Sequence, residues 1–315
     1  MTFQLTAGSA YDEPPFSAAI AEYPWWQPML NQSQQETQLF QTLQLANCSS
    51  VQCLRELSSE TLGSLGQLVQ NASYPGATGY GSFYFGPVVD SKFVRELPGQ
   101  AFKAGHFYDV PLLIDREAYE GAIFSNMSQT TQSAQVTDAE NLFPYAGRAF
   151  FSRLYQLYPR SDFNSTFFQR QTWFGDFIIN CPTYQMASSA VDLNRNASAV
   201  FKLTFAAGTQ LHASTAPFLA NQDIDWAGAN NRTLAEIMTS YWISFAVTHD
   251  PNPMRHADAP YWPSYISGGN GNLADGEGVG FTNLAVTYTT ISAQTDPDAG
   301  AKCDFFGNNG LVVMN

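Results

Sequence analysis

The sequence predicts an α/β fold in which helices cover a sheet of buried strands. Three short apolar segments, at residues 16–26, 108–114 and 199–206, have the length and the continuous hydrophobicity of core strands. Segments with helical spacing separate them along the chain. The 315 residues contain neither an internal repeat nor a linker long enough to divide them. We therefore expect a single α/β domain.

In the first half of the chain, the apolar run at 16–26 is closed by Pro24 and leads into a loop rich in large aromatic side chains. Ser33 is expected to cap a helix that continues to Ala46, and Ser59 with Glu60 starts another. A loop rich in glycine, tyrosine and phenylalanine follows at residues 76–86. The strand at 108–114 then contains the apolar run Val-Pro-Leu-Leu-Ile.

The second half is expected to hold the larger helices. Residues 138–157 show helical spacing, with Phe143, Phe150, Leu154 and Leu157 on one apolar face. Further segments follow in this order: a helical stretch at 166–191 interrupted at Pro182, the strand at 199–206, a loop at 208–226, a helix at 233–248, an Asp-Pro-Asn-Pro turn at 250–253, and a tail of strand and turn.

The composition excludes one class of partner and indicates a compartment. Asp and Glu number 27 against 14 Lys and Arg, so the net charge of −13 would repel a nucleic acid backbone or an anionic membrane. Charged residues make up only 13% of the chain, about half the typical share. Uncharged polar residues must therefore form much of the hydrophilic surface, as in secreted proteins.

Glycosylation signals and cysteines favour the same compartment. Seven asparagines stand two residues before Ser or Thr with no proline between: Asn31, Asn47, Asn71, Asn126, Asn164, Asn196 and Asn231. The four cysteines, Cys48, Cys53, Cys181 and Cys303, lack the spacing of metal ligands, so we expect disulfides rather than a metal site. The opening residues do not resemble a secretory signal, and no stretch reaches the 18 apolar residues of a membrane span.

One of the four histidines stands where catalysis would need it. His106, His249 and His256 have the context of ordinary surface or turn residues. His212 lies in a Gly-Thr-Gln-Leu-His loop directly after the strand at 199–206, and the carboxyl ends of parallel strands are where an α/β enzyme presents its base. His212 is therefore the candidate general base.

An acid follows the preceding strand in a comparable position. Glu120, with Gly121 after it, comes a few residues after the strand at 108–114, and a carboxylate there could orient the imidazole of His212. Asp115 and Glu117 stand between that strand and Glu120. The alternative, which would be the default without the surrounding pattern, is that Asp115, Glu117 and Glu120 are all solvated loop residues.

A series of motifs in a fixed order carries a family resemblance. It comprises Ser-Phe-Tyr-Phe-Gly-Pro-Val-Val-Asp at 82–90, Val-Pro-Leu-Leu-Ile before Glu120-Gly121, Cys-Pro at 181–182, the Gly-Thr loop before His212, and Trp-Ile-Ser-Phe-Ala with its Asp-Pro-Asn-Pro and Trp-Pro-Ser-Tyr at 242–265. In this order the chain resembles the type-B carboxylesterases, which include the cholinesterases and Candida rugosa-type fungal lipases. The resemblance implies the C-terminal part of an α/β-hydrolase fold, with Glu120 as triad acid and His212 as triad base.

The same resemblance implies the pairing of the cysteines. Cys48 and Cys53 match the small disulfide loop of the family, and Cys181 and Cys303 match a long-range bridge of its cholinesterase branch. Such an esterase site needs neither a cofactor nor a metal. Its substrate would be a small-molecule or lipid ester.

The chain departs from the family pattern around these residues. Family members usually have Gly at the position of Asp115, an acid at that of Tyr119, Ser at that of Tyr23, and Gly-x-Asp/Glu in place of residues 213–215. The largest departure is the nucleophile. Thr2-Phe3-Gln4-Leu5 aligns just after the family's Gly-x-Ser-x-Gly elbow, and no such motif occurs anywhere in the chain, since Gly8-Ser9 and Gly81-Ser82 lack the second glycine.

These observations leave three functional interpretations. The first is a carboxylic-ester hydrolase whose N-terminal half, with the serine and the oxyanion donors, is missing, so that the 315-residue chain is inactive alone. The second is a non-catalytic cholinesterase-like binding or adhesion module. The third is a truncated, non-functional gene product.

Overall fold

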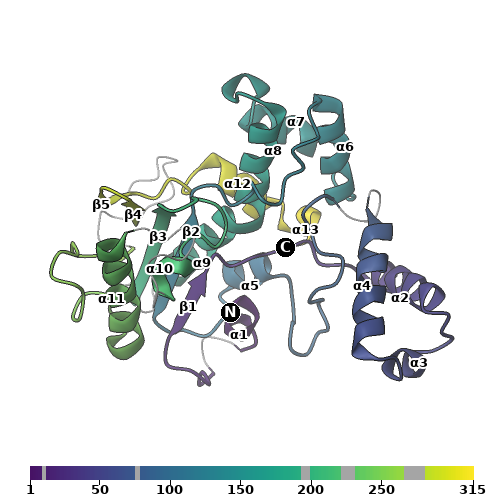
Figure 1. Cartoon of the computed structure of the whole chain (residues 1–315), viewed down its shortest axis with the longest axis horizontal. Coiled ribbons are helices and arrows are strands. Elements are labelled where there is room, and N and C mark those ends of the chain that lie inside the picture. The colour runs from purple at the N-terminus through teal and green to yellow at the C-terminus, as the bar shows by residue number, and fades with distance from the viewer. Residues whose placement is uncertain (9–11, 75–78, 193–198, 221–230, 266–280) are drawn as a thin grey trace.

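The computed structural model describes residues 1–8, 12–74, 79–192, 199–220, 231–265 and 281–315. Its centre is a five-stranded sheet (Figure 1) in the spatial order β1 (Ala19–Glu22), β2 (Leu112–Glu117), β3 (Val200–Ala206), β4 (Thr282–Thr287) and β5 (Ile291–Thr295). The first four strands are parallel and β5 pairs antiparallel with β4. This is the α/β arrangement that the apolar segments predict.

The helices of the described residues connect and cover these strands. Their bounds are α1 (Thr2–Thr6), α2 (Gln32–Leu45), α3 (Val51–Arg55), α4 (Ser59–Ser73), α5 (Pro98–Ala104), α6 (Gln132–Leu142), α7 (Arg148–Leu157), a 3₁₀ turn (Arg160–Asp162), α8 (Thr166–Gly175), a π-helical turn (Asp176–Asn180), α9 (Cys181–Asp192), α10 (Ala216–Leu219), α11 (Arg232–Thr248), α12 (Ala301–Asn308) and α13 (Gly310–Val313).

Helices pack on both faces of the sheet. On one face, Leu113 and Phe205 belong to a buried cluster with residues of α10 and α11. On the other, Ile114 and Val200 pack into a larger cluster with residues of α5, α8 and α9. Figure 1 shows α11 and α9 on opposite sides of the strands. Burial on both faces explains why these strands read as continuous apolar runs.

The second strand begins and ends later than its apolar run suggests. Leu112 to Glu117 pair residue by residue with Val200 to Phe205, so Asp115 and Glu117 lie inside the strand. Both side chains are buried. The interpretation of these acids as solvated loop residues is therefore wrong, because backbone pairing with β3 continues past the last apolar residue.

Two predicted helix features are also corrected. The helix expected over 138–157 is two helices, since Pro144 follows the end of α6 and Gly147 caps the start of α7. The first large helix is capped by Asn31 rather than Ser33. The Asn31 side chain accepts the Gln34 N–H at 3.0 Å, and the Gln34 side chain bonds back to the Asn31 N–H at 3.0 Å.

The interruption predicted at Pro182 takes the form of a π-helical turn just before it. Proline has no N–H to donate to the carbonyl four residues earlier, which here belongs to Ile178. That carbonyl instead accepts the backbone N–H of Trp26 at 3.0 Å. The break thus attaches the segment after β1, which carries the aromatic residues of the site, to the helix in the core.

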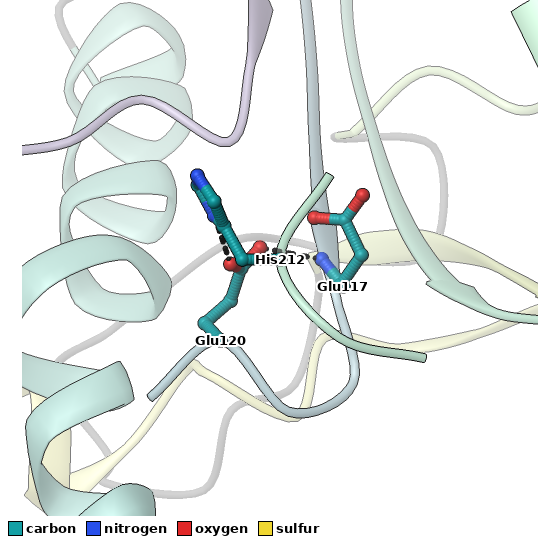
Figure 2. Close-up of side chains that lie close together, drawn as sticks. All are labelled: Glu117, Glu120 and His212. Atoms are coloured by element: carbon teal, nitrogen blue, oxygen red, sulfur yellow. Dashed lines mark hydrogen bonds and ion pairs between the residues drawn. The ribbon is translucent and has the colours of Figure 1, made fainter. Parts of the chain in front are cut away.

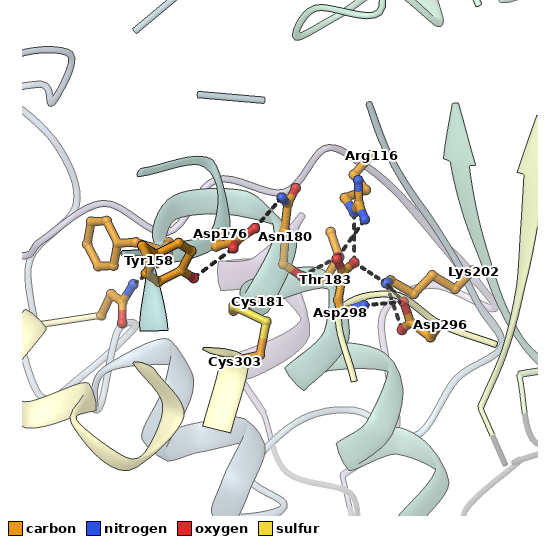
Figure 3. Close-up of a disulfide and its surroundings, with 12 residues drawn as sticks. Arg116, Tyr158, Asp176, Asn180, Cys181, Thr183, Lys202, Asp296, Asp298 and Cys303 are labelled. Carbon is orange, nitrogen blue, oxygen red and sulfur yellow. Dashed lines mark hydrogen bonds and ion pairs between the residues drawn. A yellow bond between two sulfur atoms is a disulfide. The ribbon is translucent and has the colours of Figure 1, made fainter. Parts of the chain in front are cut away.

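The C-terminal tail holds more helix than the sequence predicts. Besides β4 and β5 it forms α12 and α13, and the loop expected at 208–226 contains α10 within its described part. The disulfide Cys181–Cys303 joins α9 to α12 (Figure 3).

A buried ion-pair network fixes the segment between β5 and α12 (Figure 3). Arg116 on β2 donates two hydrogen bonds to Asp298, at 2.7 and 2.6 Å. Lys202 on β3 bonds to Asp296 at 2.7 Å and to Asp298 at 2.5 Å, and the Tyr265 hydroxyl donates to Asp296 at 2.5 Å. Arg116 is therefore directed away from the opposite face of β2, which carries Asp115 and Glu117.

Candidate active site

Glu120 lies in the turn that follows β2. The turn is anchored by backbone hydrogen bonds from Ala118 to Phe205, 3.0 Å, and from Tyr119 to Gln210, 3.0 Å. It also packs tightly on α8, because a Cβ on Gly121 would stand 1.9 Å from the carbonyl oxygen of Gln171. A glycine is required here, and it sets the position of the neighbouring Glu120.

His212 lies in the loop that follows β3, the neighbour of β2. Leu211 bridges to Tyr119 in a parallel register, which brings the two loops together at the carboxyl ends of their strands. Ala213, where the resembling family usually has glycine, adopts a φ of 68°. Alanine therefore bears a left-handed conformation at this position, which glycine would adopt without strain.

The two side chains form a hydrogen-bonded pair (Figure 2). His212 Nδ1 lies 2.7 Å from Glu120 Oε2. The other oxygen of Glu120, Oε1, accepts the backbone N–H of Glu117 at 2.6 Å. The His212 side chain is 18% exposed and the Glu120 side chain is fully buried. The carboxylate is thus held by its own strand and fixes the orientation of the imidazole.

Glu117 links the two halves of this pair. Its Oε1 accepts the backbone N–H of Thr215 at 3.0 Å and the Thr215 hydroxyl at 2.9 Å. The Glu117 backbone binds the acid and its side chain binds the loop of the base. Local reading of the sequence missed this role because it treated Glu117 as solvation. The available signal was its spacing: it lies two residues after Asp115 and three before Glu120.

Burial shifts the protonation of all these groups. It raises the pKa of Glu120 to about 7 and that of Glu117 to about 9, and the charge of neighbouring Glu120 adds to the second shift. Burial also lowers the pKa of His212, against the opposing effect of Glu117. The resting imidazole is therefore favoured in its neutral form, the form that can accept a proton.

Aromatic rings surround the imidazole. The rings of Tyr23, Phe124 and Trp25 lie 4.7, 5.1 and 6.3 Å from that of His212. His212 also lines a cavity of about 450 Å³, whose wall includes Trp25, Phe124 and the first residues of the chain, Met1 to Phe3. Aromatic side chains form much of this wall, and Thr2, Glu22 and Tyr23 add polar groups to it. Such a mixed wall beside a proton acceptor suits an organic group that carries a polar function.

The same cluster has the residue types of a metal site. One oxygen each of Glu117 and Glu120 and a ring nitrogen of His212 lie within 4.8 Å of one another. Both oxygens of Glu120 and Nδ1 of His212 are already engaged in hydrogen bonds. A cation would have to break the pair, so the arrangement fits acid–base chemistry better than metal binding.

The other histidines lie outside this cluster. His106 pairs with Glu96 at 2.5 Å on the surface, His249 ends α11 in a left-handed conformation, and His256 lies 3.9 Å from Asp258. Of the serines considered as nucleophiles, Ser82 donates to the Gly79 carbonyl at 2.8 Å, while Ser9 lies outside the described residues. Among the described side chains, no hydroxyl is hydrogen-bonded to His212.

The cysteines form two disulfides, Cys48–Cys53 and Cys181–Cys303, and no cysteine is free. Of the seven predicted glycosylation asparagines, Asn196 lies outside the described residues. The remaining six are at least partly exposed: Asn31, Asn47, Asn71, Asn126, Asn164 and Asn231. In the portions of the chain described above, no helix combines the length and apolar character needed to cross a bilayer.

Comparisons with known proteins give a consistent result. The model of the carboxylesterase family matches residues 4–276. A carboxylesterase of Penicillium expansum, patB, is 25% identical over 276 residues, which are 82% of this chain and 47% of that protein. The chain therefore spans about half the length of this curated relative.

Solved structures show the same fold. The crystal structure of Aspergillus niger EstA superimposes with a TM-score of 0.82 at 22% identity, over 100% of this chain and 62% of that one. A thermophilic PNB esterase matches with a TM-score of 0.71 at 18% identity, over 96% of this chain and 60% of that one. These structures are α/β hydrolases, and the α/β-hydrolase fold expected from the sequence is confirmed.

Proposed function

This chain belongs to the carboxylesterase family, and from that premise we propose that Glu120 and His212 are the acid and base of a serine-dependent carboxylic-ester hydrolase. The observation that carries the proposal is the 2.7 Å contact between Glu120 Oε2 and His212 Nδ1 beside a cavity. With Nδ1 bound to the carboxylate, the second ring nitrogen, Nε2, is free to accept a proton, and Figure 2 shows it directed away from Glu120.

The proposed reaction is acyl transfer through a serine. Nε2 of His212 removes the proton of a serine hydroxyl as its oxygen attacks the ester carbonyl, and returns that proton to the departing alcohol. Water then cleaves the acyl-enzyme by the same proton transfers. Glu120 orients the ring and stabilises the imidazolium that forms in each step.

The serine itself is proposed to come from a segment outside the 315 residues. The cavity beside His212 is bordered by Met1 to Phe3, so a Gly-x-Ser-x-Gly elbow preceding these residues would face the imidazole. We expect the chain alone to hydrolyse no esters, because no Gly-x-Ser-x-Gly elbow, the motif that supplies the nucleophile and an oxyanion donor, occurs in its sequence.

The substrate and the compartment are part of the same proposal. The cavity beside His212 and the neighbouring groove of about 240 Å³, lined by Trp25, Phe83 and Phe85, suit a small-molecule or lipid ester. The two disulfides and the glycosylation signals, six of which are at least partly exposed, favour a secreted glycoprotein.

Two forms of the protein test this function: the chain alone, and the chain fused to the N-terminal half of a relative that carries the serine elbow. We expect a fluorophosphonate probe and p-nitrophenyl esters to detect no activity in the first form and activity in the second. His212→Ala and Glu120→Gln should each reduce the turnover of the fusion by more than about a hundredfold.

The matched control is His106→Ala. His106 forms the same kind of pair with Glu96, at 2.5 Å, but its side chain is 58% exposed. Its removal should leave turnover unchanged. Activity in the chain alone would refute the missing nucleophile. A folded, inactive fusion would refute the esterase proposal in favour of a binding module.

A further inference from the structure

The Glu120–His212 pair belongs to a cluster of carboxyl groups, most of them buried. Asp115 and Glu117 lie on the same face of β2, two residues apart, and Glu120 follows in the turn. All three are buried, with exposed fractions of 0%, 0% and 1%. Glu22 on β1 pairs in register with Asp115 and adds a fourth carboxyl group nearby.

Few positive charges balance these acids. Arg116 and Lys202, the basic side chains of β2 and β3, are bound to Asp298 on the opposite face of the sheet. Among the described residues, the other groups that donate hydrogen bonds to these acids carry no fixed positive charge. They include the Tyr23 backbone N–H, which donates to Asp115 at 3.2 Å, and the Trp242 indole, which donates to Glu22 at 2.9 Å. Thr215 and His212 bond to Glu117 and Glu120. With a neutral imidazole, several ionised carboxylates could not coexist here, so some of the acids must hold protons.

The hydrogen bonds distinguish Glu117 from Glu120, whereas Asp115 resembles Glu117 in having one buried oxygen that receives no hydrogen bond from the described residues. Glu120 has donors for both of its oxygens, from the Glu117 backbone and from His212, as an ionised carboxylate needs. Glu117 has donors for Oε1 only, both from Thr215. Its Oε2 is buried and receives no hydrogen bond from the described residues. An ionised oxygen would be costly there, whereas a protonated one can donate.

Glu120 offers an acceptor for such a proton. Oxygens of Glu117 and Glu120 lie within 4.8 Å of each other and of the His212 ring. We infer that Glu117 is a positioning residue that remains protonated, donates its carboxyl hydrogen to Glu120, and so keeps Glu120 ionised and directed at His212. The inference rests on the proposed function, which makes Glu120 and His212 the acid and base. The rise that burial produces in the pKa of Glu117 agrees with it.

Glu117 also restrains the loop that carries the base. Tyr23, whose ring lies 4.7 Å from that of His212, adds no charge to the cluster, because burial raises the pKa of its hydroxyl. Through Thr215, Glu117 holds the loop that continues from Ala213, the alanine with a φ of 68°. One side chain thus restrains both the acid and the loop of the base.

Two variants distinguish a protonated Glu117 that donates a hydrogen bond from an ionised one. Glu117→Gln keeps a donor for Glu120 and an acceptor for Thr215 and cannot ionise. Glu117→Leu removes both. Glu140→Gln, at an exposed position of α6, is the matched control. The first readout is the infrared band of protonated carboxyl groups at pH 7, compared between the fusion to the N-terminal half of a relative and each variant of that fusion.

The second readout is the pKa of the His212 imidazole from NMR titration of the same fusion, in which the His212→Ala variant identifies the signal. We expect Glu117→Gln to lose a protonated-carboxyl band and to change the His212 pKa by less than about 0.3 unit, and Glu117→Leu to lower it by about one unit or more. Glu140→Gln should change neither.

Other results would overturn the inference. If Glu117→Gln leaves the protonated band unchanged, or lowers the His212 pKa as much as Glu117→Leu does, Glu117 is an anion. Should the leucine variant fail to fold, the infrared comparison with the glutamine variant decides alone. Neither readout needs turnover, so an inactive fusion with a neutral Glu117 refutes only the proposed esterase, and an active fusion with an ionised Glu117 refutes only this inference.

Discussion

At the scale of single residues, the candidate site is governed by burial. The carboxyl groups of Asp115, Glu117 and Glu120 all have raised pKa values because they are removed from water, while burial lowers the pKa of His212. The two kinds of shift change the stability in opposite directions as the pH rises. A carboxyl group with a raised pKa binds more protons in the folded state, and a histidine with a lowered pKa binds fewer.

Glu117→Gln should therefore flatten the dependence of stability on pH. Glu117 has a pKa of 4.5 when unfolded and about 9 when folded, so its contribution is fully present below pH 4.5 and is lost as the pH rises toward 9. A glutamine does not titrate. We expect the melting temperature of the parent fusion to fall between pH 5 and pH 9 and that of its Glu117→Gln variant to fall less.

Asp115 and Glu120 would still supply some slope, since their pKa values are also raised. The lowered pKa of His212 costs stability only below about pH 6.5, which places its effect outside most of this window. Thermal melts of Glu117→Gln, the parent and the control Glu140→Gln between pH 5 and pH 9 test whether the pH dependence of stability becomes flatter. Parallel curves for all three would contradict it.

At the scale of elements, two loops at the carboxyl ends of β2 and β3 bring the site together, and α8 supports the first of them. A Cβ at Gly121 would meet the Gln171 carbonyl at 1.9 Å, and a Cβ at Gly175 would meet the Gly121 nitrogen at 2.8 Å. The facing atoms belong to the backbone and cannot turn aside. The helix and the acid-bearing turn therefore depend on this pair of glycines.

Gly121→Ala should displace the turn and weaken the Glu120–His212 pair. Overpacking of this kind costs about 1–3 kcal/mol. The control is Gly63→Ala in α4, where nothing lies within 4 Å of the added Cβ; it should stabilise the helix by up to about 1 kcal/mol. Chemical denaturation measures both. Equal effects of the two substitutions would show that the contact between α8 and the turn is unimportant.

The two disulfides close loops of very different length. Cys48 and Cys53 are 5 residues apart and Cys181 and Cys303 are 122 apart. On the loop-entropy model, the short bridge contributes about 2 kcal/mol and the long one about 5 kcal/mol. The long bridge joins α9 to α12 next to the ion-pair network, so it also holds the C-terminal helices on the sheet (Figure 3).

At the scale of the whole molecule, the sequence predicts the sheet well because each buried strand is a short apolar run. It places Glu120 and His212 correctly after neighbouring strands, and they lie 2.7 Å apart. It misplaces Glu117, because an acid after an apolar run is usually solvated. Only the pairing with β3, which is not encoded locally, shows that the strand continues to Glu117.

Other differences also arise from information that is not local. Pro144 breaks a stretch whose apolar spacing is otherwise continuous, so helical periodicity alone suggests one helix. The two C-terminal helices, α12 and α13, are short and were read as turn. Packing of α12 against α9, with a disulfide between them, stabilises a helix that its own eight residues would not form in isolation.

The position of β1 leads to the last prediction. In the sheet as described, β1 pairs only with β2 and forms one edge, although Ala19 and Ala21 are buried like residues of a central strand. The four residues of β1 include one charge and no proline, so the strand has few of the features that protect natural edges. An unprotected apolar edge is a template for pairing with another chain.

We therefore expect the 315-residue chain expressed alone to be insoluble or oligomeric, and to become monomeric when fused to or co-expressed with the N-terminal half of a relative. Size-exclusion chromatography across a range of concentrations measures the oligomeric state, and a thermal melt measures the cooperativity of unfolding. A concentration-independent monomer with one cooperative transition would contradict this. The same result would mean that the chain is a self-sufficient domain and that the edge formed by β1 needs no further strand beside it. It would favour a binding module over an esterase that needs a partner segment.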